Sequence, residues 1–580
     1  AVDADEFITC FACAQARVVQ TCAHQLECKL RARQAARAAV RHLAFADVAV
    51  VVAHGDLERV GPRVATGAAG AQTQACEGFA AQAPAGVSLQ TEAVAPDTVR
   101  PPGATAGPML AAHCRVSGKI AERVGADGKP YHIGFELRLP LQWNGRLLYQ
   151  GGGGNDGVVR PAVGPQATQG YALNQGFAVV TTDAGHQGPT ADFGFDPIAR
   201  TDNAYNAHDK VAVTAKALIQ RYYSKPADKS YFIGCSGGGR QGMMFTQRFP
   251  SYFDGVIAMA PAMRVSKGAT IAAAWDTQAL QAIAPPGADG QPVLSRALSD
   301  ADLALVRRGI LEACDAQDGL ADGLVSNPAA CRFDVQKLQC AGAKTEACLA
   351  PQQVGALQKI MGGARNSKGE PLYFSWPWDP GMGHPANDWR MWKLGNAPAA
   401  QANSRHVFLM QDALQGYFVT PPDRSLSIYK FDFDRDPQRM DAHAWIFNTA
   451  DDAKLAPFKA RGGKLLIAHG MADPIFSPHE AIDYYKRLQN EHGASTTDFA
   501  RLFLIPGMGH CAGGAATDSW DGLTALVNWV EKGQAPQSIL AKGTAVFPGR
   551  SRPLCPYPQY AQYKGSGDPE DGSNFVCRQP

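Results

Sequence analysis

The sequence predicts an α/β fold in which one sheet is interrupted by a large inserted domain. From about residue 134, short runs rich in β-forming residues alternate with longer amphipathic runs, as strands and helices do in α/β proteins. This alternation stops after Pro261 and resumes at Lys464. Because about 200 residues separate two parts of one pattern, we expect them to form a second domain inserted into the first. The third observation is a G-x-S-x-G sequence at a junction of strand and helix.

Short apolar runs define the predicted strands, and longer runs with apolar residues at three- and four-residue spacing define the predicted helices. The predicted strands cover residues 135–140, 146–150, 177–184, 230–234, 255–260, 464–470 and 500–507. The predicted helices cover residues 205–223, 239–249 and 522–533.

The chain is predicted to have three parts, because 580 residues exceed one ordinary core. Residues 71–261 and 464–580 are expected to form the main α/β domain, and residues 262–463 an inserted lid domain. Residues 1–70 are rich in alanine and arginine and are expected to be a peripheral segment, either disordered or a cap. Residues 81–108 are dense in Pro, Gly, Ala and Thr and are also expected to be peripheral.

The charge balance argues against large charged partners. The chain has 55 lysine and arginine residues against 53 aspartate and glutamate residues, so neither a nucleic acid nor an anionic membrane is favoured as a partner. The most hydrophobic run, residues 43–54, is too short for a membrane span and contains an aspartate. We therefore expect a monomer that binds a small, mostly neutral ligand.

The cysteines indicate an exported protein. Fourteen are many for a cytosolic enzyme, and several lie close together in turn-rich sequence, which favours disulfides and a secreted or periplasmic location. The alternative is zinc ligation or buried thiols, but the C-x-x-C of Cys10 and Cys13 lies outside the predicted fold. The spacing alone does not give the connectivity.

The G-x-S-x-G sequence predicts a catalytic nucleophile. Gly234-Cys235-Ser236-Gly237-Gly238 follows an apolar strand and leads directly into an amphipathic helix, which is the setting of the nucleophile elbow of α/β-hydrolases. Glycines on both sides allow a sharp turn that exposes the Ser236 hydroxyl. The alternatives are a helix N-cap or a phosphate-binding loop, and no G-K-[ST] follows to support the latter.

A serine nucleophile needs a histidine base and a carboxylate that fixes the histidine tautomer. In this fold both follow the serine in the chain, acid first, each in a loop after a strand. Asp473 and His510 meet these conditions. The competing residues have the wrong place in the chain order or lie away from the last strand; they are Asp183, His186, His469 and His479.

Two amide groups are candidates for the oxyanion hole that acyl transfer requires. One belongs to Gly237, which follows the nucleophile, and the other to Gly154, in the glycine-rich loop after the strand at 146–150. An ordinary flexible turn is the alternative for that loop. If Ser236 and His510 meet, their neighbours Cys235 and Cys511 come close enough for a disulfide.

An acidic loop, "CDAQDGLADGL", predicts a structural calcium site. The carboxylates of Asp315, Asp318 and Asp322 repel one another unless a cation lies between them, and the carbonyls of Leu320 and Leu324 complete a set of oxygen ligands. A solvated acidic turn is the alternative, because the loop lacks the bidentate glutamate of an EF-hand.

Six segments resemble the tannase and feruloyl esterase family. They are "DKSYFIGCSGGGRQGMMFTQRFPS", "CDAQDGLADG", "LQCAGAKTEACL", "GGKLLIAHGMADPIFS", "ARLFLIPGMGHC" and "RPLCPYPQYAQYKGSGD". The resemblance runs from about Cys76 to the C-terminus, whereas the first 70 or so residues match no part of the family.

The resemblance implies an α/β-hydrolase fold with a lid, and the catalytic and calcium residues named above. It also implies five disulfides, Cys76–Cys114, Cys235–Cys511, Cys314–Cys331, Cys340–Cys348 and Cys555–Cys577. The four cysteines without a counterpart are Cys10, Cys13, Cys22 and Cys28.

The resemblance further implies a substrate site in the lid, at Arg405, Trp392 and Phe476. An arginine fork suits a planar carboxylate, and aromatic rings pack against an aromatic acid. The sequence departs from this pattern at Gly237, where a glutamate is expected, and at Leu409, where a second phenylalanine is expected.

The sequence therefore predicts a secreted serine carboxylesterase that acts on aromatic esters. The lid arginine suits a monoester of an aromatic dicarboxylic acid, and the resemblance implies mono(2-hydroxyethyl) terephthalate, hydrolysed to terephthalate and ethylene glycol. A ferulate or gallate ester is the second possibility. A calcium-stabilised binding protein without catalytic activity is the third, although all three triad positions are present.

Overall fold

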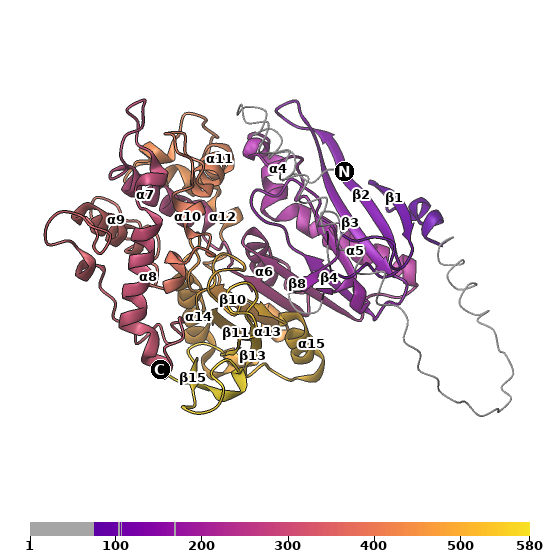
Figure 1. The fold of residues 1–580 in the computed structure, drawn as a ribbon. Helices are drawn as coiled ribbons and strands as arrows, with labels where there is room; N and C mark the ends of the chain where they lie inside the picture. The colour runs from indigo at the N-terminus through magenta and orange to yellow at the C-terminus, as the bar shows by residue number, and fades with distance from the viewer. Residues whose placement is uncertain (1–74, 102–104, 106, 167–169) are drawn as a thin grey trace, which may run out of the picture. The chain divides into compact units, whose positions relative to one another are not determined.

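A nine-stranded mixed sheet organises the part of the chain that is described by a computed structural model, residues 75–101, 105, 107–166 and 170–580 (Figure 1). The strand order is β1-β2-β3-β7-β4-β8-β9-β10-β11. The strands are β1 (Val87–Val94), β2 (His113–Val124), β3 (Pro130–Pro140), β4 (Arg146–Gln150), β7 (Ala178–Thr182), β8 (Lys229–Cys235), β9 (Gly255–Met259), β10 (Lys464–Gly470) and β11 (Ala500–Ile505). The first three strands and β7 are antiparallel neighbours, and the pairs from β7 to β11 are parallel. The predicted α/β fold is thus confirmed, and each predicted strand is present.

Helices cover both faces of the sheet. Helices α5 (Ala207–Tyr223), α6 (Gly237–Arg248) and α14 (Pro478–His492) contribute to one apolar core, and α15 (Gly522–Lys532) contributes to another. Successive strand residues point to opposite faces, so Leu147 packs in the first core and its neighbour Leu148 in the second. Parallel strands buried on both faces explain the continuous apolar runs in the sequence.

The parallel register brings the strand ends together at one edge. Cys235 of β8 pairs with Met259 of β9, and Met259 pairs with Ala468 of β10. The loops that follow β8, β10 and β11 therefore leave the sheet side by side, at the edge where open α/β sheets bind ligands.

The long insertion lies between two adjacent strands, β9 and β10. Residues 260–463 are all described and contribute no strand to the nine-stranded sheet. Their helices are α7 (Thr270–Gln281), α8 (Asp300–Cys314), α9 (Pro351–Met361), α10 (Trp389–Lys393), α11 (Gln411–Ala413), α12 (Asp441–Phe447) and α13 (Ala456–Ala460). All of them except α13 contribute to one apolar core that also takes in Ile475 and Phe476, which follow β10. Phe458 of α13 packs instead in the core that α5 and α6 share. A fully buried ion pair, Lys393 Nζ to Asp276 Oδ2 at 2.5 Å, joins α10 to α7.

Three element predictions need correction. Helix α6 begins at Gly237 rather than residue 239, so the glycines are part of its first turn. Residues 202–206 form a π-helical segment that precedes α5. Residues 81–108 are not wholly peripheral, because β1 pairs with β2 over eight residues; its alternation of exposed and half-buried residues, typical of an edge strand, gives a weak apolar signal.

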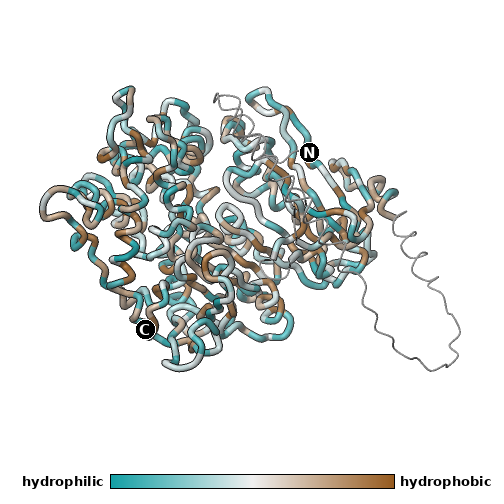
Figure 2. Tube along the Cα trace, viewed as in Figure 1, coloured by the Kyte–Doolittle hydropathy of each residue, from teal (hydrophilic) through white to brown (hydrophobic). Residues whose placement is uncertain are grey.

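The prediction for residues 1–70 lies outside the described residues. Figure 2 colours the trace by hydropathy, and hydrophilic and hydrophobic residues alternate along the helices. None of the helices in the described part of the chain is long and apolar enough to cross a membrane.

Candidate active site

Ser236 lies on a strained turn between β8 and α6. Its backbone has φ 63° and ψ −123°, a conformation that residues other than glycine rarely adopt. The turn is tight, because a Cβ atom at Gly234 would lie 2.5 Å from the carbonyl oxygen of Gly238. The Ser236 amide donates to the Met259 carbonyl at 3.0 Å, which ties the turn to the next strand. This is the geometry of a nucleophile elbow.

The acid and the histidine lie in the loops after β10 and β11. The Nδ1 atom of His510 lies 2.9 Å from Oδ2 of Asp473, whose side chain is fully buried. The other oxygen, Oδ1, accepts the amides of Ile475 and Phe476 at 2.8 and 3.1 Å. Burial opposes ionisation of Asp473, but the nearby His510 and His469 lower its pKa below the ordinary value. The carboxylate is therefore ionised and can hold the imidazole in one tautomer.

Ser236 and His510 line the same cavity, which has a volume of about 450 Å³. The glycine loop at 151–154 lines it as well, together with Trp392 and Leu409 of the insertion. The structure thus brings together residues that are 274 positions apart in the sequence, as the chain order of the motifs predicts.

A disulfide joins the nucleophile turn to the histidine loop. Cys235 and Cys511 are bonded, with their Cα atoms 5.9 Å apart. The other four disulfides that the family resemblance implies are also present: Cys76–Cys114, Cys314–Cys331, Cys340–Cys348 and Cys555–Cys577. The cysteines at 10, 13, 22 and 28 lie outside the described residues.

The candidate oxyanion amides come from two adjacent segments. A Cβ atom at Gly237 would lie 3.3 Å from the Cα of Gly153 and 3.5 Å from the carbonyl oxygen of Gly154. Neither the Gly154 nor the Gly237 amide has a hydrogen-bond acceptor among the described residues. Both donors therefore remain free for a ligand beside Ser236.

Two of the three predicted substrate-binding side chains lie beside the histidine, and the third contacts one of them. The ring centroids of Trp392 and Phe476 lie 5.8 and 5.5 Å from that of His510. The guanidinium of Arg405 lies over Trp392, 5.5 Å from the ring centroid, and its side chain is 52% exposed. Trp392 and Phe476 thus form an aromatic wall beside His510, and the half-exposed cation of Arg405 lies against it.

The competing residues have structural partners. His186 Nε2 lies 2.7 Å from the Asn155 carbonyl, and its ring stacks on Phe193. Asp183 Oδ1 accepts two backbone amides, those of Gly134 and Gly185. Neither residue is bonded to His510.

Sequence reasoning considered His469 only as a competing base, and it missed Asp388. His469 Nε2 lies 3.3 Å from Asp473 Oδ2 and 2.9 Å from the Phe476 carbonyl. Asp388 contacts both Trp392 and Arg405. The spacing of four residues between His469 and Asp473 at a strand end signals their contact, whereas no local pattern links Asp388 to Trp392 and Arg405.

The acidic loop lies apart from this site. Asp315 accepts the amides of Asp322 and Gly323 at 3.1 and 2.9 Å. Burial and the neighbouring carboxylates of Asp322 and Asp315 raise the pKa of Asp318 to about 6. Asp322 contacts Arg552. Among the described residues, no group of three or more His, Cys, Asp or Glu side chains is placed to hold a metal ion, so a cation here would also need backbone oxygens.

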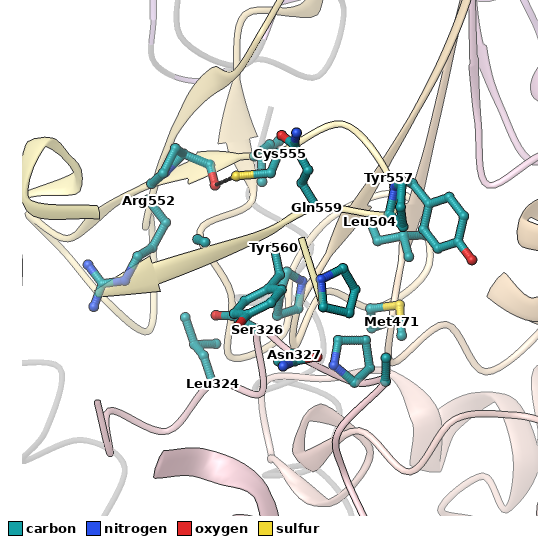
Figure 3. Close-up of a pocket in the computed structure, with 18 of the residues that line it drawn as sticks. Leu324, Ser326, Asn327, Met471, Leu504, Arg552, Cys555, Tyr557, Gln559 and Tyr560 are labelled. Atoms are coloured by element: carbon teal, nitrogen blue, oxygen red, sulfur yellow. Dashed lines mark hydrogen bonds between the residues drawn. The ribbon is translucent and has the colours of Figure 1, made fainter. Parts of the chain in front are cut away.

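A hollow of about 100 Å³ lies beside this loop (Figure 3). Leu324 and Ser326 line one side of it, and Tyr557 and Tyr560 belong to the C-terminal segment that lines another. Its lining includes Met471 but none of the described catalytic candidates.

The sequence matches the family model for tannase and feruloyl esterase over residues 114–578. Mono(2-hydroxyethyl) terephthalate hydrolase from Piscinibacter sakaiensis is 45% identical over 530 residues, which cover 83% of this chain and 87% of that protein. Feruloyl esterase B from Aspergillus oryzae has a similar structure, with a TM-score of 0.73 at 26% identity over 87% of this chain and 100% of that one. Tannin acyl hydrolase from Aspergillus niger has a TM-score of 0.66 at 22% identity over 87% of this chain and 94% of that one, and this likeness bears on the fold alone.

Proposed function

Because the chain belongs to the tannase and feruloyl esterase family, we propose that it is a serine carboxylesterase that hydrolyses esters of aromatic carboxylic acids. The observation that carries this proposal is the 2.9 Å contact between His510 Nδ1 and the buried carboxylate of Asp473, on the cavity that Ser236 also lines. The strained turn of Ser236 and the two free amides beside it are further support.

In the proposed reaction, the Ser236 hydroxyl attacks the ester carbonyl while His510 accepts its proton. Asp473 holds the imidazole and stabilises the imidazolium that forms. The amides of Gly154 and Gly237 donate to the oxyanion of the tetrahedral intermediate. His510 then gives its proton to the departing alcohol, which leaves an acyl-enzyme. A water molecule, activated by the same histidine, hydrolyses the acyl-enzyme and releases the acid.

We propose mono(2-hydroxyethyl) terephthalate as the substrate, with terephthalate and ethylene glycol as products. Arg405 would pair with the free carboxylate of the acid, and Trp392 and Phe476 would pack against its ring. Support comes from the rings of Trp392 and Phe476 beside His510, from the contact of Arg405 with Trp392, and from the 45% identity to a hydrolase of that name.

The test is a hydrolysis panel of mono(2-hydroxyethyl) terephthalate, methyl ferulate and a gallate ester. Wild type should act best on the terephthalate monoester, and Ser236→Ala should lower kcat at least about 10³-fold on every ester. Arg405→Ala should raise KM about tenfold for the terephthalate monoester only, because it removes a charge-assisted hydrogen bond to the carboxylate. Arg435→Ala, an exposed lid arginine away from the cavity, is the matched control.

Two outcomes would redirect the proposal. Faster hydrolysis of methyl ferulate or the gallate ester, with no selective effect of Arg405→Ala, would make the chain a feruloyl esterase or tannase with the same mechanism. Failure of a fluorophosphonate to label Ser236, together with no hydrolysis of any ester, would leave a binding protein.

We also propose a structural calcium ion held by Asp315, Asp318 and Asp322 with the carbonyls of Leu320 and Leu324. Oxygen ligands of this kind are what calcium prefers. A cation would also offset the burial and the repulsion from Asp322 and Asp315 that together raise the pKa of Asp318. After chelation, added calcium should raise the Tm of the protein. At a calcium concentration 100 times Kd, the free energy of unfolding should increase by about 2.7 kcal/mol. Asp318→Asn should remove that response, and an unchanged Tm in wild type would exclude the site.

The five disulfides support an oxidising location, and we propose that the protein functions in the periplasm or outside the cell. Fractionation of the native host, followed by detection of the chain in each fraction, tests this. Recovery in the cytoplasmic fraction with free thiols would contradict it.

A further inference from the structure

Three hydrogen bonds connect the loop of Gly154 to helix α6 through two side chains. The Gly153 amide donates to Asp156 Oδ1 at 2.8 Å, and the Gly152 amide donates to Gln241 Oε1 at 2.9 Å. The Gln241 Nε2 group closes the network by donating to Asp156 Oδ2 at 2.9 Å. Gln241 is fully buried, four residues after Gly237 on α6. Asp156 and Gln241 thus link the loop that contains the Gly154 amide to helix α6, which begins at Gly237.

This network determines which amide of the loop faces the cavity. The Gly151 amide donates to the Ile233 carbonyl at 2.8 Å, and the next two amides donate to Gln241 and Asp156. Only the fourth, that of Gly154, is left without an acceptor among the described residues. Because hydrogen bonds to Ile233, Gln241 and Asp156 fix the first three amides of the loop, the fourth amide points in a fixed direction.

The local structure has features that stability alone does not explain. Asp156 has φ 61°, in the left-handed region, and burial raises the pKa of its carboxyl to about 6. A Cβ atom on Gly152 would lie 1.8 Å from Asp156 Oδ1, so any larger residue there would displace the Asp156 carboxylate from its bonds. Strained backbone and buried carboxylates are costly to fold, and they are concentrated at functional sites.

We propose that Asp156 and Gln241 are positioning residues for the oxyanion hole. They hold the Gly154 amide in a fixed place relative to the Gly237 amide, so that both donors meet the oxyanion without rearrangement. The inference rests on the proposed esterase function. Neither side chain touches the substrate, and each acts through the backbone of the glycine loop.

The pattern of donors and acceptors makes the inference testable by exchange. Asp156→Asn places an NH₂ group against the NH₂ group of Gln241, and Gln241→Glu places a carboxylate against that of Asp156. The double variant Asp156→Asn/Gln241→Glu restores all three bonds. The asparagine then donates to the new carboxylate, and both backbone amides keep an oxygen acceptor.

A matched control lies in the inserted domain. Gln353 Oε1 accepts the Ala350 amide at 3.0 Å, and its Nε2 donates to Asp302 Oδ2 at 2.9 Å. Gln353→Glu therefore makes the same chemical change against a buried aspartate, in a place that does not line the cavity of Ser236. It separates the cost of two facing carboxylates from an effect on the oxyanion hole.

The experiment measures kcat, KM, Tm and the affinity for a boronic acid that mimics the tetrahedral intermediate. Each single variant should lower kcat about 10²-fold to 10³-fold, weaken the boronic acid similarly and change KM less than about threefold. The double variant should recover kcat to within about tenfold of wild type. Gln353→Glu should lower Tm while kcat stays within about twofold of wild type.

The inference is wrong if the single variants keep the kcat of wild type, or if the double variant is no better than the worse single variant. It is also wrong if kcat falls only in proportion to folded protein, since that is a purely structural role. Failure of the proposed function has a different sign: the Ser236→Ala variant would then keep the esterase activity of wild type.

Discussion

Asp388 holds two of the side chains that are proposed to bind the substrate. Its Oδ2 atom accepts the indole N–H of Trp392 at 2.6 Å and lies 3.3 Å from Nη1 of Arg405. Its Oδ1 atom is buried without a hydrogen-bond partner among the described residues. One carboxylate thus orients the aromatic wall and at the same time neutralises the cation that a substrate carboxylate would meet.

Asp388→Asn should make the site more selective for charged esters. Asparagine keeps an oxygen for the Trp392 indole but no longer competes for Arg405. A half-exposed ion pair contributes up to about 1 kcal/mol, so KM for the terephthalate monoester should fall by up to about fivefold. Steady-state kinetics of wild type and the variant, with the monoester and with the neutral diester dimethyl terephthalate, measures this change in KM.

The neutral ester serves as the control for the Asp388 variant, because it lacks the carboxylate that Arg405 would bind. A fall in KM for both esters would mean that Asp388→Asn reshapes the aromatic wall. An unchanged KM for the monoester would mean that Arg405 does not bind the carboxylate.

The elements around the nucleophile are predictable from sequence because their signals are local. The run at 230–234 has the composition of a buried strand, and the glycines on both sides of Ser236 require a sharp turn. In contrast, the bond between Asp156 and Gln241 joins positions 85 residues apart, and no local pattern reports it. Strand β1 escaped prediction for a similar reason, since its polar edge is stabilised by pairing with β2.

Removal of the Cys235–Cys511 disulfide should affect stability and activity together. It closes a loop with a sequence separation of 276, and it joins the two segments that carry Ser236 and His510. Cys340–Cys348, with a separation of 8, is the control. The chain-entropy model gives about 3 kcal/mol more stabilisation for the longer loop.

Thermal unfolding and kcat of the two double cysteine-to-serine variants measure this difference. Cys235→Ser/Cys511→Ser should show the larger fall in Tm and a lower kcat, whereas Cys340→Ser/Cys348→Ser should keep kcat. Equal Tm losses, or a kcat unchanged without the Cys235–Cys511 bond, would contradict the role assigned to this bridge.

At the scale of the whole molecule, polar contacts join the insertion to helix α14, which packs on the sheet. Tyr373 of the insertion donates from its hydroxyl to Glu480 Oε2 at 2.8 Å, at the start of α14. Arg264 Nη1 lies 3.4 Å from Glu480 Oε1. Burial raises the pKa of Glu480 to about 7, from an ordinary value near 4.5.

This shift predicts how stability depends on pH. Between about pH 4.5 and pH 7 the folded chain binds a proton at Glu480 that the unfolded chain does not, so this group lowers stability as pH rises. Glu480→Gln removes that slope. The Tm of the variant relative to wild type should therefore rise from pH 5 to pH 8 in buffered thermal scans.

Glu531→Gln provides a control of opposite sign. The hydrogen bond from Arg146 lowers the pKa of Glu531, so its stabilisation is complete above pH 4.5 and is lost only at lower pH. The Tm difference for this variant should be flat from pH 5 to pH 8. A flat difference for Glu480→Gln as well would mean that Glu480 titrates normally.

The neighbouring strands β9 and β10 have a consequence for synthesis on the ribosome. After β9 is made, about 200 residues emerge before its partner β10, which takes about 10–40 s at a usual rate of 5–20 residues per second. During that interval the growing chain exposes an unpaired sheet edge to other nascent chains. The yield of soluble recombinant protein should therefore fall when translation is slowed and rise when holdase chaperones are co-expressed.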